Sequence, residues 1–329
     1  MNKLVSIILP AFNSARYINE AITSVLAQDY GQWELLVIDD GSTDATGDIV
    51  QRINDTRIRY IKVEHMGNYC ARNTGICRAQ GEYIAFLDSD DIWLKNKLSA
   101  QVDILNSDES IGICCSEYYV VFNDDKEQLF VNPQHSFSEH LLTQGVFIKR
   151  LLFDNFILTS SAMVRKKCID RIGVFDTTFK NAMDYDMWLR LALNYKAHYL
   201  EGKYVMKRVH PGNISRDRVT SLKALLYIFK NFDAYVTGTD FFNEEYLQII
   251  RRKIQKTMYH LGLAYLSARD FKNALKYLRN CEYAPRSIFR VFARMVARLR
   301  IGFLIVLIDT YRARRQKDSL IVAQTGKEE

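Results

Sequence analysis

The feature that most constrains this chain is the alternation of apolar runs and amphipathic segments over its first ninety residues. Apolar runs that end in turn residues predict buried strands, here at 5–9, 34–38, 58–63 and 83–87. The segments between them carry apolar residues at helical spacing and predict three helices, one with its apolar positions at 18–26, one at about 45–53 and one at 69–79. Strands that alternate with helices through short links predict a mostly parallel sheet covered on both faces, an α/β fold.

Composition narrows the class of protein further. With 329 residues, 48% hydrophobic and 25% charged, the chain can bury a full core and is not a disordered or low-complexity protein. Six cysteines include no CxxC pair, which argues against a zinc site or a disulfide framework and favours a reducing compartment. The first segment, MNKLVSIILPAFNS, is expected to be a strand and not a signal peptide, with Asn13 or Ser14 capping the helix that follows.

Two of the predicted strands end in carboxylate clusters, Asp39-Asp40 and Asp88-Ser89-Asp90-Asp91. Open α/β sheets bind ligands beyond the carboxyl ends of their strands. No GxGxxG follows the first strand and no GxxxxGK[ST] occurs, so a dinucleotide oxidoreductase and a P-loop NTPase both lose their main support. A divalent cation held by carboxylates is another way to bind the phosphates of a nucleotide.

Four blocks carry a resemblance to a known family: VSIILPAFN, ELLVIDDGSTD, the pair GNYCARNTGI and GEYIAFLDSDD, and NAMDYDMWLRLA, followed by VHPGNIS. In order and spacing they resemble family 2 inverting glycosyltransferases with the GT-A fold, over roughly residues 3 to 216. The resemblance implies a GT-A domain at 1–216, with a nucleotide-sugar half at about 1–110 and an acceptor half at about 111–216. It also implies metal-dependent transfer of a sugar from a nucleotide donor, a UDP-sugar, to a hydroxyl of a glycan or lipid-linked acceptor.

By the same resemblance, Asp88-Ser89-Asp90 is the Asp-x-Asp motif that binds the donor. Asp90 would bind Mn²⁺ or Mg²⁺ directly, and Asp88 would contact the ribose, the metal or a metal-bound water. The alternative is an acidic turn that caps a helix beginning at Ile92. Three aspartates in four residues repel one another, which favours a bound cation.

The remaining donor residues are also implied by the matched positions. Asp40 would accept a hydrogen bond from the nucleotide base, although an Asx-turn is an alternative for this acidic pair. Pro10, Ala11 and Phe12 would line the same pocket, and Phe12 could equally belong to the core. Arg72 would reach the nucleotide or the diphosphate.

Asp184 is the candidate catalytic base, which would take the proton of the acceptor hydroxyl. Its alternative role is the N-cap of the helix DMWLRLAL. Relatives carry an acidic residue before this aspartate, whereas this chain has Met183, so the acceptor chemistry could differ. His210 in VHPGNIS would reach the diphosphate or the metal, with a turn residue as the alternative.

From about residue 217 to 285 the pattern is wholly helical. One helix pair resembles a tetratricopeptide hairpin, with matching residues at Leu261, Gly262, Tyr265 and Ala274. One copy is not a solenoid, because a repeat array needs neighbours to bury its faces. The hairpin is expected to pack on the catalytic domain or to form a contact with a partner or a second copy of the chain.

The segment 286–329 differs from the rest in charge. Between Arg286 and Arg315 there are eight arginines and one acid, a balance of +7 that equals the net charge of the whole chain. The apolar run IGFLIVLI is far shorter than the ~20 residues that span a bilayer. A basic amphipathic helix on an anionic membrane surface is expected, which places the protein in the cytoplasm on the inner face of the membrane. The alternative is a helix packed on the protein; nucleic acid is not an expected partner.

Two other functions remain possible at this point. A nucleotidyltransferase of related fold would need a Gly-rich, basic segment after the first strand, which LPAFNSARYI lacks. A non-catalytic scaffold that binds partners through the helical hairpin has no evident use for Asp40, Asp88, Asp90 and Asp184 together. A metal-dependent glycosyltransferase is therefore the favoured interpretation.

Overall fold

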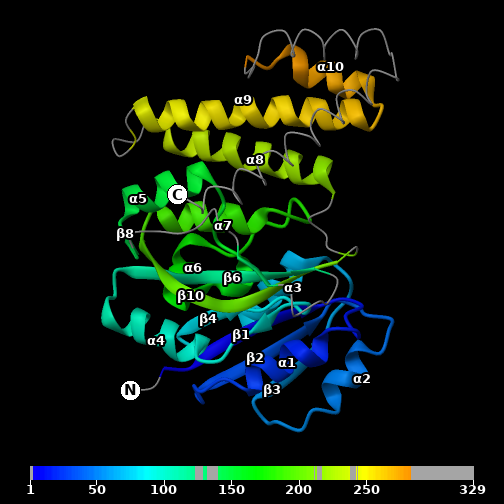
Figure 1. Ribbon diagram of the computed structural model, residues 1–329, viewed down its shortest axis with the longest axis vertical. Coiled ribbons are helices and arrows are strands. Elements are labelled where there is room, and N and C mark those ends of the chain that lie inside the picture. The colour runs from blue at the N-terminus through cyan, green and yellow to red at the C-terminus, as the bar shows by residue number, and fades with distance from the viewer. Residues whose placement is uncertain are drawn as a thin grey trace, which may run out of the picture. The chain divides into compact units, whose positions relative to one another are not determined.

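The computed structural model describes residues 3–122, 129–131, 140–210, 212, 217–237, 242 and 244–282. The chain divides by its internal contacts into two compact units, Met1–Ile214 and Ser215–Glu329. The first unit holds the sheet and its flanking helices, and the described part of the second contains helices alone (Figure 1).

The described strands of the first unit form one mixed sheet in the order β3-β2-β1-β4-β9-β6-β10-β5, with β7 beside β6 and β8 beside β10. The pairs among β1, β2, β3 and β4 are parallel, as predicted, whereas β9 and β5 run antiparallel to their neighbours. The strand bounds are β1 Val5–Ala11, β2 Trp33–Asp39, β3 Ile58–Lys62, β4 Tyr83–Phe86, β5 Ile92–Trp93, β6 Ile111–Phe122, β7 Leu129–Val131, β8 Leu141–Leu142, β9 Met163–Arg165 and β10 Lys196–Val209.

Helices cover both faces of this sheet. Alternate residues of β1, such as Ile7, share one apolar cluster with the buried sides of α1 and α4. On the opposite face, α3 lies so close to β1 that a Cβ on Gly75 would come within 2.6 Å of Ile8. The helix bounds are α1 Ile18–Leu26, α2 Thr46–Gln51, α3 Asn68–Arg78, α4 Lys97–Ser107, α5 Gln144–Phe153, the 3-10 turn η2 Thr159–Ser161, α6 Lys166–Ile172 and α7 Met183–Ala192. All three helices predicted in the first ninety residues are present, although the first begins at Ile18, later than a cap at Asn13 or Ser14 would place it.

The expected capping residues differ from the observed ones. Neither Asn13 nor Ser14 caps α1 with its side chain, because Tyr17 occupies the N-cap position. Asn13 instead adopts a positive φ of 49°, and its side-chain oxygen accepts from the Thr43 amide at 2.9 Å. The acidic turn after β4 does not lead into a helix at Ile92, since that residue begins strand β5.

The alternative role of Asp184, as the N-cap of the helix that follows, is also wrong. Asp184 is not the N-cap of α7, because Ala182 occupies that position with a positive φ of 64° and Asp184 lies in the first turn. Asp186, two residues further on, pairs with Arg190 at 2.8 Å. The Asp184 carboxylate is therefore not used to begin its own helix.

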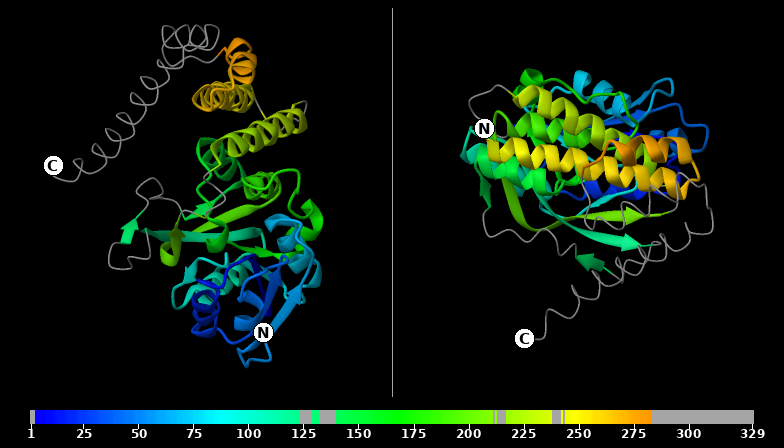
Figure 2. Two further views of the ribbon diagram at one scale, coloured as in Figure 1. Left: turned by 90° about the vertical axis from the view of Figure 1, so that its right-hand side faces the viewer. Right: turned by 90° about the horizontal axis from the view of Figure 1, so that it is seen from above.

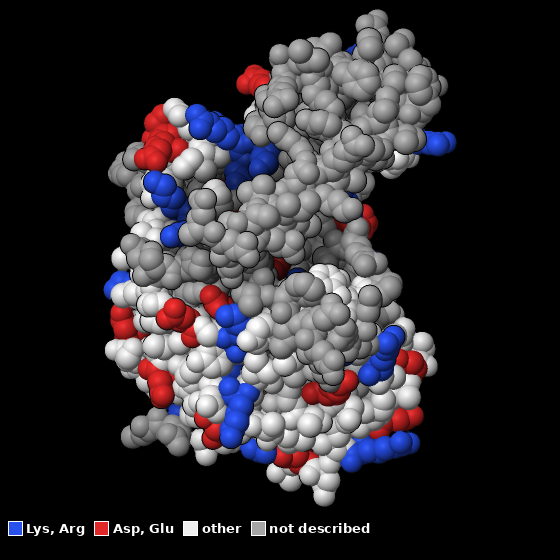
Figure 3. Space-filling view, viewed as in Figure 1, with Lys and Arg blue, Asp and Glu red and all other residues white. Residues whose placement is uncertain are grey.

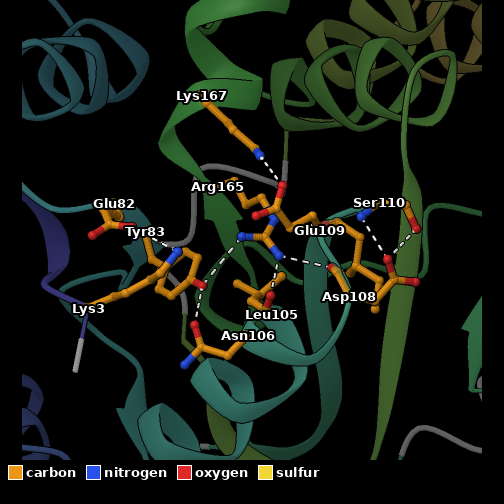
Figure 4. A network of polar contacts seen from close by, with 11 residues as sticks. Lys3, Glu82, Tyr83, Leu105, Asn106, Asp108, Glu109, Ser110, Arg165 and Lys167 are labelled. Carbon is orange, nitrogen blue, oxygen red and sulfur yellow. Dashed lines mark hydrogen bonds and ion pairs between the residues drawn. The ribbon is translucent and has the colours of Figure 1, made fainter. Parts of the chain in front are cut away.

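A buried arginine connects β4 to its antiparallel neighbour β9 (Figure 4). It lies at the start of β4, whereas the acidic cluster follows the end of that strand. Arg165 of β9 donates from Nε to the Ile111 carbonyl at 2.7 Å and from Nη2 to the carbonyls of Leu105 and Asp108. These contacts satisfy carbonyl groups at the C-terminal end of α4, which the helix itself leaves without donors. The same guanidinium lies 3.4 Å from the Tyr83 hydroxyl of β4, so it ties β4, β9 and α4 together.

The second unit contains α8 Arg218–Val236, α9 Glu244–Ser267 and α10 Phe271–Arg279, with α9 in contact with both others (Figure 2). The predicted hairpin is confirmed as α9 and α10. A Cβ on Gly262 would lie 2.7 Å from Leu278, so the glycine permits close packing of the two helices. Leu261, Tyr265 and Ala274, which matched the repeat spacing, all lie in the apolar cluster of this unit.

The remaining predictions for the C-terminal segment concern residues outside the described part. The tail from 286 to 329, with its eight arginines, is not described.

On the face shown in Figure 3, acidic and basic side chains are interspersed over the sheet-bearing unit in the lower part of the view. None of the described helices is long and apolar enough to cross a membrane. All six cysteines are free thiols, so none of them forms a disulfide.

Candidate active site

The carboxyl ends of β1, β2 and β4 lie together at one edge of the sheet because these strands are parallel. Ala11, the last residue of β1, pairs with Asp39, the last residue of β2. The Asp40 amide donates to the Ala11 carbonyl at 2.8 Å. The Asp39 carboxylate accepts from the Ser42 amide at 2.8 Å and from the Tyr60 hydroxyl. Asp39 therefore shapes the turn after β2, as the Asx-turn alternative predicts for this pair.

Asp40 is 2% exposed, and its carboxylate faces the loop that leads into α3. It accepts from the backbone amides of Met66 at 2.8 Å and Gly67 at 2.9 Å. His65 Nδ1 lies 2.9 Å from the same carboxylate, and the His65 ring stacks on Phe12 with centroids 4.1 Å apart. Phe12 is 45% exposed, so it is not a core residue. An exposed aromatic ring thus lies beside a buried carboxylate that three protein groups hold in place.

The second acidic cluster follows β4. Asp88, Asp90 and Asp91 each offer one carboxylate oxygen, and these three atoms lie within 4.8 Å of one another. Burial raises the pKa of Asp90, and the charge of Asp88 raises it further. Burial and then the charge of Asp90 raise the pKa of Asp91 well above its usual range. Closely spaced carboxylate oxygens are the ligands that Mg²⁺ and Mn²⁺ prefer, so the donor set fits such a cation.

A buried arginine and three hydroxyl groups surround this cluster. Arg72 of α3 is 2% exposed, and its guanidinium pairs with Asp88, while its Nε has no hydrogen-bond partner among the described residues. The Asp88 amide donates to Ser160 Oγ at 3.0 Å, and Ser89 Oγ lies 2.8 Å from Ser14 Oγ. The Arg72 charge is thus directed at the first aspartate of the motif, next to the position expected for a diphosphate.

The end of β10 closes the other side of the cluster. Arg208 donates from its amide to Asp91 at 3.0 Å and from Nε to the Asp90 carbonyl at 2.9 Å. His210 Nε2 lies 3.0 Å from the Asp90 carboxylate, while its Nδ1 accepts from the Gly212 amide at 3.1 Å. A neutral imidazole whose Nδ1 accepts a hydrogen bond carries its proton on Nε2. In that tautomer His210 donates to Asp90.

Asp184 lies in the first turn of α7, where two hydroxyl groups hold its carboxylate. Tyr69 of α3 donates to one oxygen at 3.3 Å, and Thr159 of η2 donates to the other at 3.2 Å. The charges of both Asp88 and Asp184 raise the pKa of Arg72, so both carboxylates lie within electrostatic reach of this guanidinium. The candidate base and the acidic cluster thus belong to one polar region.

The structure brings together most residues that the sequence singled out at one end of the sheet. Several contacting residues were not predicted, because their partners lie far along the chain: 69 positions separate Ser160 from Asp91, and 115 separate Tyr69 from Asp184. No local pattern marks such residues. The unpredicted contacts are those of Tyr69, His65, Thr159, Ser160 and Arg208.

Comparison with known proteins gives a family. Residues 6–173 match the family described as Glycosyl transferase family 2. A protein named an uncharacterized glycosyltransferase of Rickettsia typhi is 32% identical over 70% of this chain and 71% of its own length. The Escherichia coli protein WfgD, named a UDP-Glc:alpha-D-GlcNAc-diphosphoundecaprenol beta-1,3-glucosyltransferase, is 32% identical over 67% of this chain and 83% of its own length.

Solved structures agree in fold. The crystal structure of a fragment of S. aureus TarS with UDP-GlcNAc is similar at a TM-score of 0.66 and 20% identity, over 83% of this chain and 79% of that one. Such a likeness shows the GT-A type of fold, with its mixed sheet between helices. The family match covers the strands and turns that carry both acidic clusters. The chain is a glycosyltransferase and belongs to glycosyl transferase family 2.

Proposed function

We propose that this protein transfers a sugar, with inversion, from a UDP-sugar to a hydroxyl of a lipid-linked glycan, with the help of Mn²⁺ or Mg²⁺. The observation that carries this proposal is the separation of two kinds of carboxylate. Asp88, Asp90 and Asp91 are crowded, and the raised pKa values of Asp90 and Asp91 favour a cation between them. Asp184 is not one of these three carboxylates, and neutral hydroxyl groups hold it, which leaves it able to accept a proton.

The nature of the substrates is inferred from relatives. WfgD is named for transfer from UDP-Glc to a GlcNAc-diphosphoundecaprenol acceptor, and WfaP of E. coli, 34% identical over 67% of this chain, has the same name. The TarS fragment holds UDP-GlcNAc, and a mannosyltransferase from Pyrobaculum calidifontis, with a TM-score of 0.60, holds GDP-Man and Mn²⁺. These names support a UDP-sugar donor, a divalent cation and an acceptor with a lipid diphosphate.

Each part of the site has a role in this proposal. Asp40, Pro10, Ala11 and Phe12 hold the nucleotide, with Phe12 offering its exposed ring to the base. Asp90 and Asp88, with Ser89 between them, would hold the cation and the donor, and a bound cation neutralises charge that gathers on the leaving diphosphate.

The acidic cluster and the base are assisted by neighbouring groups. His210 donates a hydrogen bond that keeps the Asp90 carboxylate oriented. Arg72 adds a fixed positive charge beside Asp88. Asp184 takes the proton of the acceptor hydroxyl as that oxygen attacks the sugar. We further assign the donor to residues of about 1–110 and the acceptor to residues of about 111–216.

A thermal-shift panel of nucleotides and nucleotide-sugars, each with and without Mn²⁺, tests the donor and the metal. Ligand at a hundred times its Kd stabilises the folded state by ~2.7 kcal/mol, which is readily measured. We expect a Mn²⁺-dependent shift with a UDP-sugar. A shift with free nucleoside triphosphates alone would favour the nucleotidyltransferase, and no shift with any nucleotide would favour the scaffold.

Asp184→Asn tests the base. We expect donor binding in the thermal-shift assay to remain while transfer falls by about a hundredfold or more, because the amide cannot accept the proton. Donor binding by the wild-type protein without any turnover would point to a non-catalytic binding protein. Unchanged transfer by the variant would remove Asp184 from the mechanism.

A membrane contact through 286–315 remains a proposal, supported by the local charge of +7 in the sequence. It would place the enzyme on the inner face of the cell membrane, where a lipid-linked acceptor is within reach. Removal of 286–329 should abolish sedimentation with anionic vesicles and leave donor binding intact. Retained sedimentation would exclude this segment as the anchor.

A further inference from the structure

The Asp184 carboxylate has a distinctive environment. Both of its oxygens are engaged by hydroxyl groups, Tyr69 at 3.3 Å and Thr159 at 3.2 Å. Both hydroxyl-bearing residues are 6% exposed, and they come from different elements, α3 and η2. Neither element contains Asp184, so its orientation is set by tertiary contacts and not by its own helix.

The direction of the Tyr69 hydrogen bond follows from its second contact. The amide of Met183 donates to the Tyr69 oxygen at 3.1 Å, which leaves the hydroxyl proton free to point at Asp184. Burial, together with the nearby charge of Asp184, raises the pKa of Tyr69 far above its ordinary value. The phenol therefore stays protonated and remains a donor throughout the physiological range.

The two donors are themselves fixed on the side of the acidic cluster. The Tyr69 ring lies against Phe175, with centroids 5.5 Å apart, and beneath the Arg72 guanidinium at 5.2 Å, which pairs with Asp88. Thr159 is followed directly by Ser160, whose hydroxyl donates to Asp91 at 2.6 Å. The same two elements, α3 and η2, thus contact both the metal-binding aspartates and Asp184.

We propose that Tyr69 and Thr159 are positioning residues that hold the Asp184 carboxylate at a fixed place relative to the acidic cluster. The inference rests on the proposed role of Asp184 as the base. Two neutral donors fix the orientation of the carboxylate without supplying a positive charge that would form an ion pair with it. A base held in this way meets the acceptor hydroxyl in a productive geometry, and small displacements of such a group lower the rate steeply.

The test compares Tyr69→Phe and Thr159→Val with Thr159→Ser, which keeps the hydroxyl. Transfer from the UDP-sugar selected by the binding panel to GlcNAc-diphosphoundecaprenol gives kcat and KM. We expect the first two variants to lose about ten- to a hundredfold in kcat, with KM for the donor within about twofold. Thr159→Ser should keep kcat within about threefold of the wild type.

Tyr83→Phe is the matched control, because it removes a buried hydroxyl that bonds to Asn106 at 2.7 Å, away from the site (Figure 4). It should leave kcat unchanged whatever it does to the melting temperature. Normal kcat in both Tyr69→Phe and Thr159→Val would overturn the inference, as would a rise in donor KM that accounts for the whole loss. If Tyr69→Phe does not fold, the comparison of kcat between Thr159→Val and Thr159→Ser tests the inference by itself.

Asp184→Asn, measured beside these variants, separates the two proposals. An inactive Asp184→Asn with fully active Tyr69→Phe and Thr159→Val would refute the positioning role and leave the base in place. An active Asp184→Asn would refute the base and, with it, the positioning inference.

Discussion

The two acidic clusters follow β2 and β4, the strands on either side of β1, and look alike in sequence, yet their carboxylates differ in spacing and in pKa. After β2, Asp39 and Asp40 accept hydrogen bonds from backbone amides and from the Tyr60 phenol of β3. After β4, Asp88, Asp90 and Asp91 crowd their oxygens within 4.8 Å, and the pKa values of the last two are raised. In the second cluster the mutual repulsion of the carboxylates is only partly offset by Arg72, His210 and Ser160, so a cation would stabilise all three as anions.

This difference indicates how the two clusters serve one substrate. A carboxylate fixed by backbone donors offers a rigid acceptor for a neutral ligand group, such as the edge of a base. Carboxylates that repel one another gain most from a divalent ion, and so from the diphosphate that the ion brings. The same substitution, aspartate to asparagine, should therefore have opposite effects on the stability of the metal-free protein at the two places.

Asp90→Asn should give the largest effect. If Asp90 holds the cation as proposed, its loss should lower transfer by about a hundred- to a thousandfold and remove the Mn²⁺-dependent thermal shift. Without metal, the variant should melt at a higher temperature than the wild type, because one partly buried negative charge and its repulsion are gone. Asp103→Asn, at an exposed position of α4, is the control and should change neither quantity. A lower melting temperature of metal-free Asp90→Asn would contradict the account of this cluster.

Lys97→Met tests how burial alone affects a positively charged group, in contrast to the carboxylates of the acidic clusters. The quantity measured is the pH dependence of the free energy of unfolding. Lys97 is fully buried, with its ammonium 2.7 Å from Gln101 and over the Trp93 ring, and burial lowers its pKa from 10.5 to about 7. Between pH 7 and 10.5 the unfolded chain therefore binds more protons here than the folded one. Stability should rise with pH across that window by about 1.4 kcal/mol per pH unit.

Chemical denaturation at several pH values checks this expectation. In Lys97→Met the rise attributed to residue 97 should disappear, and the variant should be more stable than the wild type at pH 7.5. The difference between the two proteins isolates Lys97 from other groups that titrate in the same range. An equal pH dependence in both proteins would mean that the Lys97 amine is not neutral in the fold.

Asp40→Asn should give the smallest of these effects and the opposite sign to Asp90→Asn. The amide would direct an NH₂ group at one of the two backbone amides that now donate to the carboxylate, Met66 or Gly67. A buried donor without an acceptor lowers stability by about 1–3 kcal/mol. The melting temperature without metal and the affinity for the UDP-sugar should both fall. If the melting temperature of metal-free Asp40→Asn were equal to or higher than that of the wild type, the two clusters would not differ in how the protein stabilises their carboxylates.

The sequence predicted the parts of this structure that depend on local pattern. The parallel strands and their helices followed from apolar periodicity, and the acidic residues stood out because they come directly after strands. The antiparallel partners β9 and β5 did not follow, because they are only three and two residues long. The contacts of Tyr69 and Ser160 could not be predicted either, since pairs so far apart in sequence meet only through tertiary packing.

The turn Thr159–Ser161 has a consequence for redesign of the enzyme. Thr159 contacts Asp184 and Ser160 contacts Asp91, so a single peptide bond joins the supports of the two chemical centres. The Cα atoms of these two supporting residues are therefore held at a fixed distance, about 3.8 Å. Surrounding loops can be exchanged to accept new glycans. These three residues should be kept unchanged in such a redesign, because replacing them would disturb the supports of both aspartates.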